Sequence, residues 1–130
     1  MKDDFPVRIV VAGSRDFSNR KLAYKVLDIV KEKIDKPFEI VSGCARGADS
    51  LGEWWAKDNG INVKRFPADW NTYGKRAGYL RNKEMAEYGT HLILFWDGIS
   101  KGSKHMLDLA EKNDLNVTVI RYDLLGVNRE

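Results

Sequence analysis

The chain has 130 residues, 43% of them hydrophobic, so it is long enough to bury one continuous core and we expect a single domain over residues 1–130. The net charge is only +3, which does not indicate a general polyanion-binding surface. No apolar run approaches the roughly 20 residues that cross a bilayer, and the start MKDDFPVR is charged. We therefore expect a cytoplasmic protein without a membrane partner, and the single Cys44 excludes an internal disulfide framework.

Strand and helix patterns alternate along the chain. The β-branched run VRIVVA at 7–12 predicts a strand buried on both faces, and similar runs follow at 38–41, 63–66, 91–96 and 117–122. Amphipathic stretches between them predict helices at 19–34, 48–59, 75–88 and 102–114. This alternation predicts an α/β fold, a Rossmann-like three-layer sandwich with a parallel five-stranded sheet in the order 3-2-1-4-5.

The segment VSGCARGADS, residues 41–50, joins a predicted strand to a predicted helix through two glycines. Glycine permits close approach of a ligand to the backbone, and the first amides of a helix attract anions. The segment FWDGISKGSKHM, residues 95–106, repeats this kind of junction after the fourth strand. The pair predicts one site for a phosphorylated or nucleotide-like ligand.

In the predicted strand order the crossovers change direction between the first and fourth strands, and ligands bind at such switch points. The residues that follow the strands therefore form the candidate site. We expect ligand contacts from Gly13, Ser14, Arg15, Ser42, Gly43, Arg46, Gly47, Asp49, Trp70, Arg81, Asn82, Asp97, Ser100, Gly102 and Ser103.

Several of these residues also have plain structural interpretations. Asp49 could cap the second helix instead of contacting a ribose or base. Arg81 and Asn82 could form a solvated patch, although the apolar boundary beside Arg81 favours an inward role. Trp70 follows the third strand, where its ring could stack on a base or simply pack. The two histidines have no metal-ligand company, so we expect neither a metal nor a cofactor.

Four segments together resemble the YspA-like branch of the SLOG superfamily. They are VAGSRDF, VSGCARGADSLGEWWA, PADWNTYGKRAGYLRNKEM and FWDGISKGSKHM, and they cover nearly the whole chain. The superfamily also includes the LOG phosphoribohydrolases and the DNA-processing protein DprA. The resemblance implies a Rossmannoid domain that binds nucleotides, nucleotide-derived signals or nucleic acid.

The LOG motifs imply roles for particular residues. Their RKxxM motif resembles the sequence from Arg81 to Met85, which implies that Arg81 contacts the ligand. Their PGGxGTxxE loop aligns with residues 97–106, where Gly102 and Ser103 keep the phosphate-holding positions. Met106 stands where LOG enzymes have a catalytic glutamate, and a thioether cannot act as a general acid or base.

We therefore expect a binding protein, a sensor or sequestering module for a nucleotide or nucleotide-derived small molecule. The alternative is a nucleoside-phosphate or nucleotide-sugar hydrolase that uses an aspartate at a strand end. A third possibility is single-stranded nucleic-acid binding of the DprA type, with Trp70 supplying stacking. Exposed apolar positions on the later helices could also permit a homodimer.

Overall fold

The computed structural model describes residues 5–125, and its strands form one parallel sheet in the order β3-β2-β1-β4-β5, as predicted. The strands are β1 (Val7–Gly13), β2 (Phe38–Ser42), β3 (Val63–Arg65), β4 (His91–Trp96) and β5 (Asn116–Arg121). The central strand β1 is paired on both sides, with Val10 opposite Val41 of β2 and Leu92 of β4. Residues 9–12 of β1 are buried.

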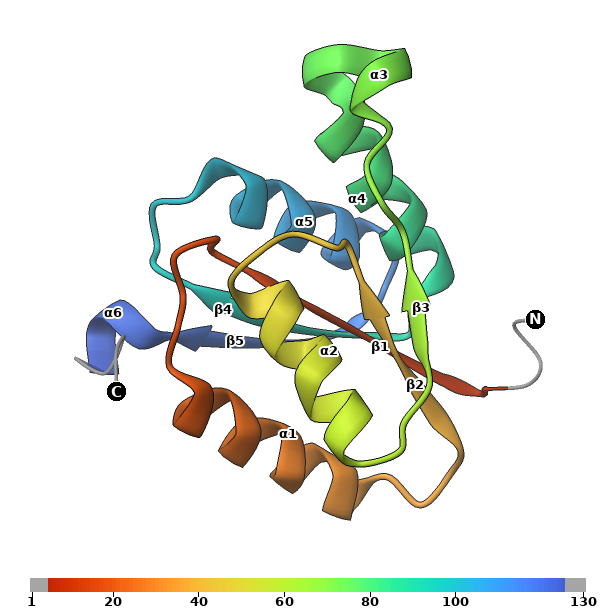
Figure 1. Cartoon of the computed structure of the whole chain (residues 1–130), viewed down its shortest axis with the longest axis vertical. Helices are drawn as coiled ribbons and strands as arrows, with labels where there is room; N and C mark the ends of the chain where they lie inside the picture. The colour runs from red at the N-terminus through yellow and green to blue at the C-terminus, as the bar shows by residue number, and fades with distance from the viewer. Residues whose placement is uncertain (1–4, 126–130) are drawn as a thin grey trace.

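Helices cover both faces of the sheet (Figure 1). One layer contains α1 (Arg20–Lys33) and α2 (Ala48–Asp58), and the other contains α4 (Ala77–Tyr88) and α5 (Lys101–Lys112). Successive side chains of β1 pack against opposite helix layers. Val11 packs in one core cluster with Trp55 of α2, and Val10 packs in the other with Met85 of α4. This confirms the three-layer sandwich, because alternate side chains of a strand point to opposite faces.

The segment after β3 differs from the expectation of a loop followed by a helix over 75–88. It forms a short helix α3 (Trp70–Tyr73) and a 3-10 turn η2 (Gly74–Arg76), and α4 begins only at Ala77. The cause is local, because the Asp69 side chain accepts a hydrogen bond from the Thr72 amide at 3.1 Å and so caps a new helix. Figure 1 shows α3 projecting beyond the other elements, at the end of α4.

Smaller differences occur at the other element ends. β5 begins one residue earlier than predicted, and Tyr122 starts a short helix α6 (Tyr122–Leu125) instead of ending the strand. The centroid of the Tyr122 ring lies 4.7 Å from that of the Phe17 ring. Tyr122 therefore packs in the core at the point where the strand ends. Among residues 5–125, no helix has both the length and the apolar character needed to span a bilayer.

Candidate functional site

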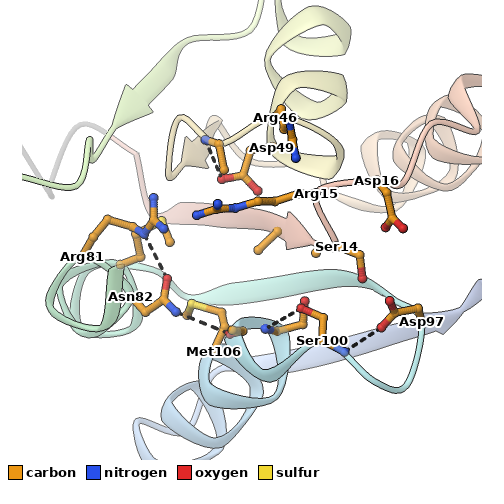
Figure 2. Close-up of a pocket in the computed structure, with 16 residues that line it drawn as sticks. Ser14, Arg15, Asp16, Arg46, Asp49, Arg81, Asn82, Asp97, Ser100 and Met106 are labelled. Atoms are coloured by element: carbon orange, nitrogen blue, oxygen red, sulfur yellow. Dashed lines mark hydrogen bonds between the residues drawn. The ribbon is translucent and has the colours of Figure 1, made fainter. Parts of the chain in front are cut away.

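A cavity of about 470 Å³ opens where β1 and β4 end, which is the switch point of the sheet. Its walls are the loop after β1, the β2–α2 junction, α4, and the loop that leads into α5 (Figure 2). We call it the switch-point cavity. Most of the predicted ligand residues line it: Gly13, Ser14, Arg15, Arg46, Asp49, Arg81, Asn82, Asp97, Ser100, Gly102 and Ser103.

Asp49 and Arg81 form the buried back wall of the switch-point cavity. The Asp49 Oδ2 atom accepts hydrogen bonds from the amides of Gly43 at 3.1 Å and Ala45 at 3.3 Å. The Arg81 guanidinium donates through Nη1 to the Gly43 carbonyl and through Nε to Asn82 Oδ1 at 3.0 Å. Arg81 is only 9% exposed and Asp49 only 5%. Arg81 is therefore an inward residue, and the hypothesis of a solvated patch is wrong.

Burial perturbs both charged groups. It raises the pKa of Asp49 to about 6, although the positive charge of Arg81 and the amides of Ala45 and Gly43 act in the opposite direction. Burial also lowers the pKa of Arg81, while the Asp49 carboxylate opposes that shift. A carboxyl group that titrates close to neutral pH inside a cavity is a candidate for proton transfer.

The backbone amides of the first glycine loop already donate hydrogen bonds to nearby side chains. The amides of Gly43 and Ala45 bind Asp49, and the Cys44 amide donates to Ser42 Oγ at 3.0 Å. An anion can take these three amides only by displacing those side chains. Gly47 has a φ of +82°, and a Cβ atom there would lie 2.5 Å from the carbonyl oxygens of Ser14 and Arg15. Glycine at this position is therefore required by the fold itself.

The second junction, at the start of α5, is more open toward the switch-point cavity. Asp97 Oδ1 accepts from the amides of Ile99 at 2.9 Å and Ser100 at 2.8 Å, and Ser100 Oγ caps the helix by accepting from the Ser103 amide at 3.4 Å. Burial raises the pKa of Asp97, but the amides of Ser100 and Ile99 outweigh it and keep that pKa below its usual value. Nothing lies within 4 Å of a Cβ atom built on Gly102.

Ser103 gives the cavity wall a buried hydroxyl group without a hydrogen-bond partner. The residue is 4% exposed and lies in the first turn of α5, and its Oγ atom makes no hydrogen bond in the described part of the chain. Ser14, which is 2% exposed, also lines the cavity: its amide donates to the Phe95 carbonyl at 3.0 Å, and its hydroxyl helps to lower the pKa of Asp97. Ser103 is therefore the residue whose hydrogen bonding a ligand could complete.

Positive side chains converge on the same space. Figure 2 shows Arg15 reaching across the cavity toward Arg81, and the charge of Arg15 further lowers the Arg81 pKa. Arg46 lies on the wall beside Asp49. Two guanidinium groups that face one another repel, so an anion between them would be stabilised by both. Within residues 5–125, no group of three or more His, Cys, Asp or Glu side chains could hold a metal ion.

The remaining predicted residues lie outside the switch-point cavity. Trp70 and Gly43 line a neighbouring cavity together with Arg15, Arg46 and Arg81, and Gly47 lines a further one. Ser42 lines none of these cavities: its hydroxyl donates to Glu53 at 2.6 Å and accepts from the Cys44 amide. The structure thus gives Ser42 a role in shaping the loop.

The ligand list drawn from the sequence omits several residues that line these cavities. Met85, Met106 and Asp16 line the switch-point cavity, and Lys75 and Tyr79 line a cavity next to Trp70. Met106 is fully buried, so the position where LOG enzymes have a glutamate carries an apolar wall. Helical spacing could have found Tyr79, because it lies three residues before Asn82 in α4 and therefore shares a helix face with it. Lys75 lies in η2, where that spacing does not apply.

The chain matches one family model and is similar in sequence to a phage protein. Residues 7–73 match the model of YAcAr, the YspA, cpYpsA-related SLOG family. The chain is also 34% identical to the Gene 61 protein of Mycobacterium phage D29 over 116 residues, which is 85% of this chain and 93% of that protein.

Among solved structures, the chain resembles the DNA processing protein A (DprA) from Streptococcus pneumoniae, with a TM-score of 0.58 at 18% sequence identity. The match covers 99% of this chain and 64% of that one, so this chain spans less than two thirds of the DprA chain. At this identity the likeness supports the shared fold.

Proposed function

Because the chain belongs to the YspA, cpYpsA-related SLOG family, we propose that it binds a nucleotide or a nucleotide-derived small molecule in the switch-point cavity, as a sensor or sequestering protein. The observation that carries this proposal is the buried hydroxyl of Ser103, whose Oγ atom has no partner within residues 5–125. A buried polar group without a partner costs about 1–3 kcal/mol, and a phosphate oxygen would remove that cost.

The surroundings of this hydroxyl favour an anion. Ser103 lies in the first turn of α5, where the helix dipole attracts negative charge, and Arg15 and Arg81 face the same space. Asp16, Asp49 and Asp97 also line the cavity, so an anion is favoured beside these two guanidinium groups and not throughout the cavity. A volume of about 470 Å³ falls in the range of about 300–1,000 Å³ that small-molecule sites occupy. These features support a small phosphorylated ligand over a long nucleic-acid strand.

Native mass spectrometry of the purified protein, followed by calorimetric titration of nucleoside mono-, di- and triphosphates, tests the proposal. Ser103→Ala should weaken binding about tenfold or more, because it removes a hydrogen bond to a charged group. Its stability should stay unchanged or rise, since it also removes a buried hydroxyl that has no partner. Lys104→Ala is the matched control: Lys104 is next in α5 but pairs with Asp108 at 2.5 Å. Unchanged affinity in both Ser103→Ala and Ser14→Ala would contradict the proposal.

A hydrolase is the second candidate, and the raised pKa of Asp49 is the observation that favours it. With a pKa of about 6, a fraction of Asp49 carries a proton near neutral pH, so this side chain could act as a general acid toward a ligand in the cavity. Chromatography of nucleoside monophosphates after long incubation tests this alternative. Base released by the wild type and abolished in Asp49→Asn would establish the hydrolase, and release equal to the no-enzyme control would exclude it for those substrates.

A further inference from the structure

A smaller cavity of about 210 Å³ lies next to the switch-point cavity, between α3, α4 and the start of α5. Trp70, Gly78 and Tyr79 supply its apolar surface, and Arg15, Lys75 and Arg81 add positive charge. Among residues 5–125, no carboxylate lines this cavity, whereas Asp16, Asp49 and Asp97 line its neighbour. We call it the Trp70 cavity.

The two aromatic rings of the Trp70 cavity are exposed but held in position. Trp70 is 50% exposed and Tyr79 is 51% exposed, so neither ring contributes to the core. The Trp70 Cη2 atom lies 3.5 Å from where a Cβ atom of Gly78 would stand, which places the indole against α4. The Tyr79 ring packs edge-on against His105, with centroids 4.5 Å apart at 76°. Each ring therefore packs against a neighbour on one part of its surface and is exposed to a ligand on the rest.

The Trp70 cavity is continuous with the proposed phosphate site. Arg15, Arg81, Asn82 and Gly102 line both cavities. A ligand whose anionic end lies between Arg15 and Arg81 can therefore extend its other end to Trp70. The Asn82 side chain, which donates to the Gly102 carbonyl at 3.5 Å, lies on the boundary between the two spaces.

We propose that the Trp70 cavity is a nucleobase subsite, in which the base of the bound nucleotide stacks on the indole of Trp70 while its phosphate lies at the start of α5. This inference rests on the proposed function, and it assigns a binding place to the base, which the phosphate site does not contact. A planar, uncharged heterocycle joined to a phosphate matches exposed aromatic faces beside cations and without carboxylates. Every base can stack on an indole ring. We therefore expect the subsite to distinguish nucleotides from other phosphate esters but to discriminate little among the bases.

Titration of the four ribonucleoside 5′-monophosphates, their nucleosides and ribose 5-phosphate into the wild type and Trp70→Ala tests the subsite. We expect at least one nucleotide to bind the wild type more tightly than ribose 5-phosphate. Trp70→Ala should weaken nucleotide binding by roughly 5- to 150-fold, the effect of replacing one stacking aromatic, and leave ribose 5-phosphate unchanged. Tyr73→Ala is the matched control, because Tyr73 is an exposed aromatic of the same short helix that lines neither cavity.

A second variant guards against a folding defect in Trp70→Ala. Gly78→Leu places a side chain in the Trp70 cavity, and its Cβ atom meets Trp70 only at ordinary contact distance, so it should block nucleotides while the protein stays folded. Equal affinity of the wild type for nucleotides and ribose 5-phosphate, or a nucleotide preference that survives in both variants, overturns the subsite and leaves the phosphate site standing. Nucleoside binding that needs Trp70, without binding of ribose 5-phosphate, supports the subsite and contradicts the phosphate site. Binding of none of these compounds overturns both.

Discussion

Asp49 offers a test of the loop geometry that needs no ligand. Its carboxylate is buried, accepts the amides of Gly43 and Ala45, and has a pKa raised to about 6. The substitution Asp49→Asn keeps a side-chain oxygen that can accept these amides, but it removes the charge and the titration. The wild type and this variant should therefore differ in how stability depends on pH.

The sign follows from the two pKa values of Asp49. In the unfolded chain the carboxyl titrates near 3.8, and in the folded protein near about 6, so the folded protein binds the proton more tightly. The stabilising effect of protonation is fully present below pH 3.8 and is lost as the pH rises through about 6. The difference between the two values corresponds to about 3 kcal/mol of unfolding free energy, because each tenfold change in proton affinity is worth about 1.4 kcal/mol.

Urea unfolding of both proteins at a series of pH values between about 4 and 7 measures this difference. The free energy of unfolding of Asp49→Asn, relative to the wild type, should increase by about 2.4 kcal/mol over that range, because at pH 4 part of the unfolded-state carboxyl is already ionised. Contributions from other carboxylates, such as Asp97, cancel because both proteins contain them. A difference that stays constant with pH would show that Asp49 titrates normally in the folded protein, and the argument from its burial would be refuted.

Four further predictions concern the same site. Arg81→Ala should destabilise the fold by about 1–3 kcal/mol in urea unfolding, since it removes the donor to the buried Gly43 carbonyl and the positive charge that acts on the Asp49 carboxylate. Adding Asp49→Asn should recover part of that loss, and purely additive effects would contradict the interaction between the two charges. Gly47→Ala should lower the melting temperature, because a Cβ atom there meets two carbonyl oxygens at 2.5 Å, whereas Gly102→Ala should not, because its Cβ position is open. Met106→Glu should unfold at a lower urea concentration than the wild type, because it places a carboxylate where a fully buried thioether packs. The wild-type protein should release no adenine from adenosine monophosphate in chromatography, because the Met106 thioether cannot act as a general acid or base.

The sequence by itself determined the architecture. β-Branched runs such as 7–12 favour burial on both faces, and short strands alternating with helices favour a parallel sheet with right-handed crossovers. The order 3-2-1-4-5 is one of the common doubly wound orders that meet these conditions, and the structure has it. The same order brought the glycine-rich and polar strand ends to the switch point, where most of the predicted ligand residues line one cavity.

Only the tertiary structure decided how those residues are used. Arg81 donates to the carbonyl of Gly43, 38 positions away along the chain, and no spacing rule connects them. The burial that raises the Asp49 pKa and the missing partner of the Ser103 hydroxyl depend on what packs around these residues. The wall made by Trp70 against Gly78 likewise depends on α3, which one local cap at Asp69 creates. Hydrogen-bond partners and solvent exclusion are properties of the packed chain, and local sequence does not contain them.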